Sequence, residues 1–179
     1  KASLFRERPG ADERLSPGSR VEPGDLLFLE IEGTREMHVY VLAEDRKGKA
    51  FVLFPTPTFD RRNPLPGGRL HRLPGTRGGK LVNWEVTSAG GDESVVVIGS
   101  LKPLEDLERD IASIPAAAPG APVAYGEVSE EAKQQLYRGI GGVKASPSAA
   151  GAAEPRVLGP IMRSLPGQSK RTDDLWVWQ

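Results

Sequence analysis

The chain has 179 residues and carries 24 Lys and Arg against 24 Asp and Glu, so its formal net charge at pH 7 is zero. Without a basic excess or an acidic tail, the sequence gives no support to a nucleic-acid role. The absence of cysteine excludes disulfides, thiol nucleophiles and zinc–thiolate sites. The high content of glycine (21) and proline (16) predicts much irregular structure around one domain with tails.

No apolar run approaches the ~18 to 20 residues that cross a bilayer, and no signal peptide is visible. The chain begins at Lys1 rather than at a methionine. We therefore expect a missing upstream segment to supply a signal or a membrane anchor. The protein is then expected to be extracytoplasmic, in the periplasm or at the cell surface, with no membrane contact of its own.

The pattern changes from irregular to β after the first residues. Residues 1–19 are polar and without period, and they predict a flexible lead-in. The polar turn at residues 45–49, with Gly48 near its tip, joins two strongly alternating segments. Segments rich in β-branched and aromatic residues predict a three-stranded meander, at residues 26–33, 35–45 and 50–54.

Two more strands are predicted after a proline-rich segment. Residues 67–75 read as a short edge strand. Residues 80–88 alternate so that Val82, Trp84 and Val86 face inward.

A central strand and a terminal strand complete the prediction. Residues 94–100, SVVVIGS, form a near-continuous apolar run, which is typical of a strand buried on both faces. At the end of the chain, Trp176 and Trp178 recur at strand spacing. Two tryptophans are costly to leave in water, so residues 173–179 are predicted to return to the sheet.

Two helices are predicted between these strands. Residues 102–114 have apolar side chains at helical spacing, and Pro103 suits a first helical position. Residues 128–142 contain a second helix that Ser129 can cap and Gly139 can end. The predicted fold class is mainly β, an antiparallel β-sandwich or curled sheet with two short peripheral helices.

An ordered set of short motifs runs through the predicted strands. A Pro-Gly-Asp turn leads into the first strand, a tyrosine lies in the second, and LFP ends the third. Two proline–glycine turns and a Ser-x-x-Pro segment follow. The motifs are Pro23-Gly24-Asp25, Tyr40, Leu53-Phe54-Pro55, Asn63-Pro64-Leu65-Pro66-Gly67, Leu73-Pro74-Gly75 and Ser100-Leu101-Lys102-Pro103.

In order and spacing, these motifs resemble the bacterial family called domain of unknown function 4384 (DUF4384), over about residues 20–105. The resemblance implies a protein whose relatives occur beside bacterial membrane anchors, sensor-like kinases and caspase-like proteases, often outside the cytoplasm. The family has no assigned catalytic residue, so the resemblance implies none here. We expect one β-rich domain at residues 20–179. Its parts are a family-like core (20–105), helices and linkers that wrap the core (106–172, with a linker at 143–157) and the returning strand (173–179).

The two histidines are the candidates for acid–base or metal chemistry. His38 lies on a predicted strand and His71 on the edge strand, and neither belongs to an HxH or HxxxH pattern. Either role would require them to converge with a carboxylate such as Asp25 or Asp60. We interpret both as surface or half-buried strand residues, and predict no catalytic, cofactor-binding or metal site.

Glycine-rich segments and serines give no stronger signal. GTRGGK at residues 75–80 lacks the terminal Ser or Thr and the helix of a phosphate-binding loop. GIGG at residues 139–142 closes a helix rather than following a strand, and no serine stands in a G-x-S-x-G turn. The protein is therefore not expected to be an enzyme or to need a cofactor.

The proline-rich segment after the third strand is interpreted as a rigid corner. Pro55 and Pro57 stop the strand, and Phe54 and Phe59 are predicted to anchor the loop. Asn63 and the glycine pair that follows it supply turn geometry.

Basic side chains crowd the same region. Rigid loops on a β scaffold are where binding modules place their contacts, although an arginine cluster is also a common solvated face. The possible partner-binding surface consists of Arg61, Arg62, Arg69, His71 and Arg72.

The pattern favours a non-catalytic interaction or sensory module of a bacterial cell-envelope protein that binds protein or an envelope polymer. A first alternative is a structural accessory domain of a larger membrane-anchored protein, which pairs through an exposed apolar edge strand. A second is an undetected hydrolase. It would require His38 or His71 to meet an acid or a serine in a pocket.

Overall fold

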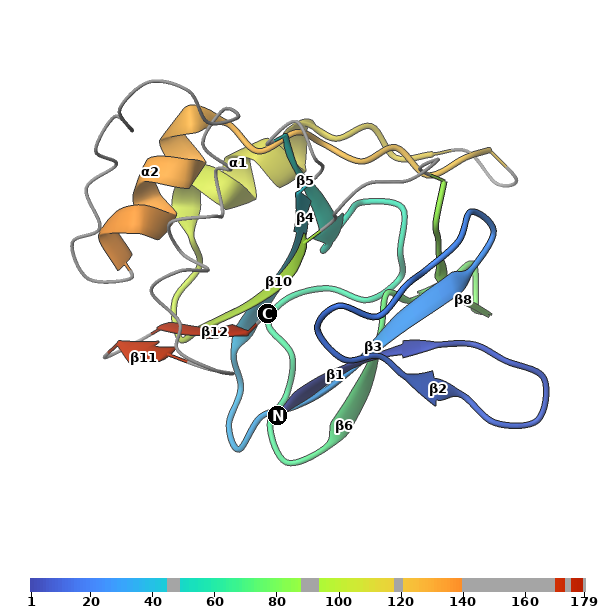
Figure 1. Ribbon diagram of the computed structural model, residues 1–179. Helices are drawn as coiled ribbons and strands as arrows, with labels where there is room; N and C mark the ends of the chain where they lie inside the picture. The colour runs from blue at the N-terminus through green and yellow to red at the C-terminus, as the bar shows by residue number, and fades with distance from the viewer. Residues whose placement is uncertain (45–48, 88–93, 118–120, 140–169, 173–174, 179) are drawn as a thin grey trace, which may run out of the picture.

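The computed structural model describes residues 1–44, 49–87, 94–117, 121–139, 170–172 and 175–178, with the backbone alone for 137–139 and for the last two segments (Figure 1). The turn predicted at residues 45–49 lies outside these residues except for Lys49, and so does the linker predicted at 143–157. The fold has three layers, which are two antiparallel sheets and a pair of helices. The predicted fold class, mainly β with two short helices, is confirmed.

The first sheet is built around one long strand, β3, which lies between β1 and β6. Its order is β2-β1-β3-β6, and the short strand β9 also pairs with β3. All of these pairings are antiparallel. The strands are β1 (Ala2–Arg6), β2 (Glu13–Arg14), β3 (Leu26–Glu32), β6 (Leu70–Leu73) and β9 (Trp84–Glu85).

The second sheet has the order β11-β12-β10-β4-β5 and is also antiparallel. Its strands are β4 (His38–Glu44), β5 (Ala50–Phe54), β10 (Ser94–Ser100), β11 (Lys170–Thr172) and β12 (Leu175–Trp178). A separate hairpin joins β7 (Gly75–Arg77) to β8 (Lys80–Val82). The predicted central strand at 94–100 and the predicted return of the chain end to the sheet are both confirmed.

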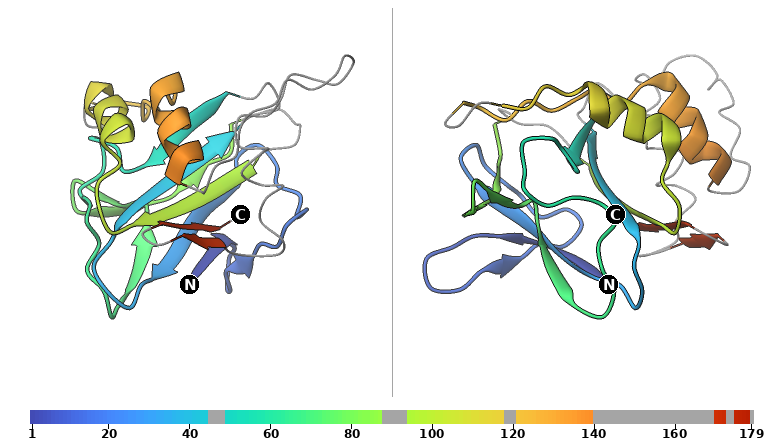
Figure 2. Two further views of the ribbon diagram at one scale, coloured as in Figure 1. Left: turned by 90° about the vertical axis from the view of Figure 1, so that its left-hand side faces the viewer. Right: turned by 180° about the vertical axis from the view of Figure 1, so that it is seen from behind.

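The two helices, α1 (Glu105–Ser113) and α2 (Glu130–Gly139), lie together on the outer face of the second sheet (Figure 2). The predicted cap of α2 is present, because the Ala132 amide donates to the Ser129 hydroxyl at 3.2 Å. The predicted end of this helix at Gly139 borders residues that lie outside the described part of the chain. The first helix begins later than predicted. Pro103 lies outside it, since Leu104 is its N-cap.

Two hydrophobic cores hold the three layers together. The core between the sheets includes Leu29 of β3 and Val39 and Val41 of β4. The core under the helices includes Tyr40 and Leu42, which point from the other face of β4. The second sheet is therefore covered on both faces, which explains why β4 and β10 carry apolar side chains at nearly every position.

The predicted meander of three strands is wrong at its first step. β4 pairs with β5 and β10, whereas β3 belongs to the other sheet. Alternation of apolar and polar residues shows which face of a strand is buried, but it does not show which strand lies beside it. Pairing depends on which neighbouring strands let each face bury its apolar side chains. One face of β3 is apolar, and the other carries Glu30 and Glu32 beside Phe28, so β3 belongs in the sheet whose outer side is partly open to water.

The predicted lead-in is also wrong, because residues 1–19 contain β1 and β2. β1 pairs along β3 from Ala2 opposite Ile31 to Arg6 opposite Leu27. Leu4 packs against the core between the sheets, and Phe5 stacks on Phe28 with ring centroids 5.2 Å apart. These contacts give a polar segment enough buried apolar area to become a strand.

The strand predicted at residues 80–88 is divided in two at Asn83. β8 pairs with β7, while β9 pairs with β3. Trp84 is buried as predicted, and Val82 and Val86 are half-buried. The Asn83 side chain accepts a hydrogen bond from Arg72 at 2.9 Å and donates one to Glu7 at 2.6 Å. Both the oxygen and the nitrogen of its amide therefore have partners at the point where the strand is divided.

Candidate functional site

The crossover loop, residues 55–69, carries the chain from β5 in the second sheet to β6 in the first (Figure 1). The Asn63 amide pairs with the backbone of Val39, donating to its carbonyl at 2.9 Å and accepting from its N–H at 3.0 Å. Met37 and Leu65 exchange two backbone hydrogen bonds. The loop thus runs along the start of β4 like an irregular extra strand.

Buried side chains and one close backbone approach fix this loop. Phe54 and Phe59 are fully buried, as predicted for the anchors of the corner. A side chain at Gly67 would place its Cβ 2.3 Å from the Arg35 Cα, so only glycine fits at this crossing. The peptide bonds before Pro55, Pro64 and Pro74 are cis.

Of the predicted partner-binding surface, Arg61 and His71 come together in the interior. His71 is only 3% exposed, and its Nδ1 lies 3.1 Å from the Arg61 guanidinium. Since arginine can only donate, Nδ1 is the acceptor, and Nε2–H donates to the Pro66 carbonyl at 2.7 Å. Both ring nitrogens of His71 are therefore occupied in holding the crossover loop against β6.

The other three members lie apart from this pair. The Arg62 guanidinium donates to loop carbonyls, including those of Thr56 at 3.3 Å and Pro57 at 3.2 Å. Arg72 points to the outer face of the first sheet, 3.4 Å above the Phe28 ring centroid. Arg69 is exposed, and no hydrogen bond or ion pair is seen for it among the described residues. The structure therefore does not gather the five residues on one face, and their binding role stays a prediction.

A cleft of about 500 Å³ lies between the crossover loop and α1. The loop supplies one wall, the segment from Pro103 through α1 supplies the other, and the start of β4 closes one end. The residues that line the cleft are His38, Pro55, Thr56, Pro57, Arg62, Asn63, Pro103, Glu108, Ile111 and Ala112.

The polar end of the cleft is built on Tyr40. Its hydroxyl donates to Glu108 Oε1 at 2.6 Å and accepts from the Leu104 amide at 3.1 Å. Burial raises the pKa of the Tyr40 phenol, and the hydrogen bond to Glu108 raises it further. Tyr40 is thus a neutral donor that fixes Glu108 and the start of α1 on the second sheet.

Two residues that line the cleft each bury a polar atom that has no hydrogen-bond partner within the described part of the chain. The atoms are Nδ1 of His38 and Oγ1 of Thr56, and the Thr56 residue is 1% exposed. The nearest carboxylate oxygen to His38 Nδ1, Glu108 Oε1, is 3.8 Å away, which is too far for a hydrogen bond. An unpaired buried polar group costs about 1–3 kcal/mol, so these two atoms call for an explanation.

Sequence reasoning finds only part of this cleft. The carboxylates that the sequence suggests as partners of His38, Asp25 and Asp60, are both engaged elsewhere. Glu108 is missed because it lies in a helix far along the chain from His38. Thr56 stands between two prolines, where a threonine is ordinary turn composition.

Asp60 shows what the glycine-rich segment does. Its carboxylate accepts the backbone N–H groups of Gly78 and Gly79 at 3.0 and 2.9 Å. Both glycines have positive φ and form the tight turn of the β7–β8 hairpin. The hydrogen bond from Gly79, followed by that from Thr76, lowers the pKa of Asp60. GTRGGK is therefore a hairpin closed by a carboxylate, and not a phosphate loop.

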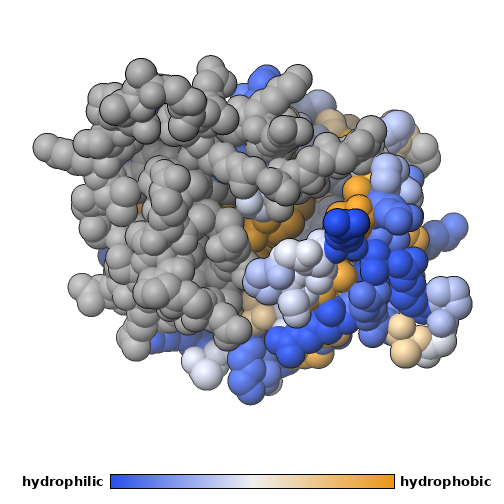
Figure 3. All heavy atoms as spheres, viewed as in Figure 1, coloured by the Kyte–Doolittle hydropathy of each residue, from blue (hydrophilic) through white to orange (hydrophobic). Residues whose placement is uncertain are grey.

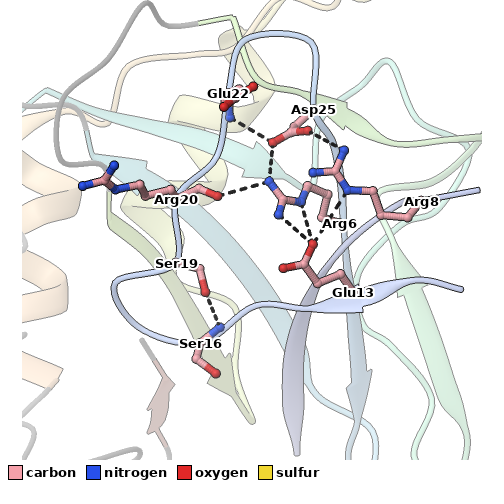
Figure 4. Close-up of polar contacts among 8 residues, drawn as sticks. All are labelled: Arg6, Arg8, Glu13, Ser16, Ser19, Arg20, Glu22 and Asp25. Carbon is pink, nitrogen blue, oxygen red and sulfur yellow. Dashed lines mark hydrogen bonds and ion pairs between the residues drawn. The ribbon is translucent and has the colours of Figure 1, made fainter.

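A second group of charges lies at the outer edge of the first sheet (Figure 4). Asp25 Oδ2 accepts from Arg6 at 2.8 Å and from the Glu22 amide at 2.9 Å, while Arg6 also bonds Glu13 at 2.6 Å. The Arg6 guanidinium is the largest cause that lowers the pKa of Asp25. The pairs tie β1 and β2 to the turn before β3, and hydrophilic side chains gather over this side of the molecule (Figure 3).

Two negative findings apply to the described residues. They contain no group of three or more His, Cys, Asp or Glu side chains placed to hold a metal ion. None of their helices combines the length and the apolar character needed to span a membrane.

Comparison with known families agrees with the order of the sequence motifs. Residues 20–103 match the family described as "Domain of unknown function (DUF4384)". This part of the chain is a DUF4384 domain. The resemblance found in the sequence is thereby confirmed. No curated protein and no solved structure matches the chain.

The DUF4384 residues include β3 to β10, while β1, both helices and the β11–β12 pair lie outside the match. Three motif residues hold the fold together. Asp25 anchors Arg6, Tyr40 anchors α1, and Asn63 pairs with β4. By contrast, the buried side-chain atoms His38 Nδ1 and Thr56 Oγ1 have no hydrogen-bond partner within the described residues.

Proposed function

We propose that the protein is a non-catalytic interaction module of a bacterial cell-envelope protein, and that it contacts a protein or an envelope polymer through the cleft between the crossover loop and α1. The observation that carries the proposal is that two residues lining that cleft, Thr56 and His38, each bury a polar atom that has no partner within the described residues. A partner that reached these groups would offset the stability that the folded protein loses by burying them unpaired.

The envelope setting of this proposal rests on the family resemblance, whose members occur beside membrane anchors and often outside the cytoplasm. The domain would be extracytoplasmic and tethered through a segment outside these residues. Fusion of the natural gene product to a reporter enzyme that is active only outside the cytoplasm would test this. Activity of the reporter supports the setting, and its inactivity in a stable fusion contradicts it.

The contact surface is tested by comparing what three versions of the protein capture from a bacterial envelope extract. Thr56→Val removes the unpartnered hydroxyl at nearly constant volume, and Arg69→Ala removes the exposed arginine of the predicted surface. We expect Thr56→Val to lose partners that the wild type and Arg69→Ala both retain. If only Arg69→Ala loses captured partners, the contact surface lies at the tip of the crossover loop rather than in the cleft. Arg61, Arg62 and Arg72 are poor probes, because their guanidinium groups hold the fold.

A second candidate function, a hydrolase, is favoured by one observation. His38 faces Glu108 in a cleft, and a histidine beside an acid is the arrangement that this candidate requires. A panel of chromogenic ester and peptide substrates would test it with wild type and His38→Ala. Turnover by the wild type that disappears in His38→Ala would favour the hydrolase function over the interaction function. Absence of turnover by both proteins would argue against the hydrolase function.

The accessory-domain alternative is favoured by β6, which ends the first sheet and exposes 59% of Leu70. Such an edge can pair with a strand of a neighbouring domain. Leu70→Lys should then abolish association with neighbouring domains of the same polypeptide in analytical ultracentrifugation. Unchanged association in that variant would exclude β6 as the contact.

A further inference from the structure

The β1–β2 hairpin, residues 1–15, joins the fold through β1, which pairs with β3. The hairpin lies outside the residues that match the DUF4384 family, whereas β3 lies inside them. We infer that two copies of this protein exchange the hairpin, so that each copy places its β1 on the β3 of the other. This contact does not involve the cleft, and it is therefore independent of the proposed function.

The edge of β3 is a specific acceptor for the β1 sequence. All five residues of β1 pair with residues of β3, and Leu4 packs against the core between the sheets. Phe5 stacks on Phe28 with ring centroids 5.2 Å apart, and the Arg6 guanidinium reaches the Asp25 carboxylate at 2.8 Å (Figure 4). The acceptor thus fits an extended Leu-Phe-Arg strand, and every second copy of the chain carries that strand.

The hairpin is less deeply buried than the strand that accepts it. Residues 1–27 are all described, and none of them is fully buried. In β3, by contrast, Phe28, Leu29 and Ile31 are at most 2% exposed. Release of the hairpin leaves an unpaired edge on a buried strand, which favours rapid refilling by the nearest β1. As the protein concentration rises, the β1 of a second copy competes more effectively for this edge.

The connection between β2 and β3 has the properties of a hinge. The hinge segment, residues 16–23, is exposed except at Val21. Its turn is closed by two hydrogen bonds, from the Ser19 amide to the Ser16 carbonyl at 2.9 Å and from the Ser16 amide to the Ser19 hydroxyl at 3.0 Å (Figure 4). Water can replace such exposed bonds at little cost. In an extended form the segment would span about 26 to 29 Å, far more than the ~4.8 Å between neighbouring strands.

Exchange replaces each contact of the hairpin with an identical contact in the second copy. The balance between monomer and dimer therefore depends on the protein concentration and on the conformation of the hinge segment. Because each copy both donates and accepts a hairpin, the result is a closed dimer with two-fold symmetry. Gly18 favours the monomer, since its φ of +84° in the closed turn is a conformation that glycine adopts without strain.

The first experiment traps the exchanged strand with a disulfide, because the natural chain has no cysteine. Two versions of the full chain are mixed at high concentration and mildly oxidised, one with Ser3→Cys and a mass-tagged one with Glu30→Cys. Ser3 and Glu30 are opposite each other on β1 and β3, within the reach of a disulfide. We expect a cross-linked heterodimer whose yield rises with concentration and incubation time.

The control mixture combines Ser3→Cys with Glu85→Cys. Glu85 is exposed and lies opposite Leu26, so exchange does not bring it to Ser3. The mixture with Glu30→Cys should give at least about tenfold more heterodimer, because only the exchanged strand holds the two sulfur atoms together. Equal yields from the two mixtures would overturn the exchange.

Two glycine variants of the full chain then test the hinge. Gly18→Ala strains the closed turn of the monomer and should raise the dimer association constant about tenfold for each of the two hinges. Gly10→Ala is the matched control. Gly10 also has a positive φ, +96°, and open space around it, but it lies in the loop between β1 and β2, which moves with the hairpin.

Analytical ultracentrifugation would compare the two variants with wild type over a range of concentrations. Gly10→Ala should leave the association constant unchanged, because its strain is the same in monomer and dimer. An equal rise with both variants, or no rise with Gly18→Ala, would contradict exchange through residues 16–23. None of these outcomes alters the envelope-extract test of the cleft, so the two proposals can fail separately.

Discussion

Side chains take the place of missing strand partners in the crossover loop. Asn63 satisfies both backbone groups of Val39, Asp60 accepts two N–H groups of the β7–β8 turn, and Arg62 donates to loop carbonyls. A partly buried loop needs such bonds, because backbone groups that leave water without a partner destabilise the folded state. We therefore interpret the polar residues of this segment first as residues that stabilise the fold.

Asn63→Ala should lower the free energy of unfolding by about 2 kcal/mol, because two hydrogen bonds are lost and two partly buried backbone groups of Val39 are left unpaired. Urea denaturation monitored by tryptophan fluorescence would measure the change. Arg69→Ala, an exposed position in the same loop, should change stability by no more than about 0.5 kcal/mol. Equal effects of the two variants would show that the Asn63 bonds contribute nothing.

Asp25 should make stability depend on acid pH. The Arg6 guanidinium and the Glu22 amide lower its pKa in the folded protein, so its contribution is present above the unfolded pKa of about 3.9. The contribution is lost as the pH falls through the lower, folded pKa.

The test compares urea midpoints of wild type and Asp25→Asn at several pH values. The variant should be less stable at pH 7, and the difference should disappear in strong acid. Glu36→Gln, at an exposed carboxylate for which no contact is seen among the described residues, should show no such difference. A gap between wild type and Asp25→Asn that is constant with pH would disprove the ionic origin.

At the scale of elements, β4 joins the layers. Its inward face contributes Val39 and Val41 to the core between the sheets, and its outward face contributes Tyr40 and Leu42 to the core under the helices. The hydroxyl of Tyr40 also anchors Leu104, the N-cap of α1. The position of α1, and with it one wall of the cleft, is therefore fixed by a strand of the DUF4384 domain.

The path of the crossover loop past the β3–β4 connection predicts unequal effects of two neighbouring substitutions. Gly67→Ala forces a Cβ to within 2.3 Å of the Arg35 backbone and should cost about 3 kcal/mol or more. Gly68→Ala has open space around it and should cost about 1 kcal/mol, because its φ of +74° is unfavourable for alanine. Thermal unfolding by circular dichroism would rank them, and the opposite ranking would contradict this crossing.

For the whole molecule, the family match covers the two sheets only in part. The outer face of the second sheet needs α1 and α2, which lie beyond residue 103. Without those helices, a row of fully buried side chains would meet water. They are Tyr40, Leu42, Val52, Val96 and Ile98.

A chain shortened to residues 1–103 should therefore aggregate or lack cooperative unfolding, whereas a chain of residues 1–139 should remain monomeric and cooperative. Size-exclusion chromatography and urea denaturation would decide between these outcomes. The longer fragment is the control, because it lacks β11 and β12 but keeps both helices. A monomeric, cooperative 1–103 fragment would show that the helical layer is dispensable.

Local patterns found most of the elements, and they failed where a partner decides the structure. The run at residues 94–100 is apolar on both faces, and this alone predicted a central strand. β1 has no such pattern, and it is a strand because β3 offers it a complementary edge. Likewise, the arginines around β6 look like one basic surface in the sequence, but alternation along the strand puts His71 inside and Arg72 outside.

Local period, turn chemistry and motif order were enough to predict the class of the fold, the family of residues 20–103, the strand at the chain end and the cap of α2. They did not reveal that β3 and β4 lie in different sheets, or that His38, Thr56 and Glu108 line one cleft. Strand pairing and the meeting of distant side chains depend on which faces bury each other. That information is distributed over the whole chain, and no single segment contains it.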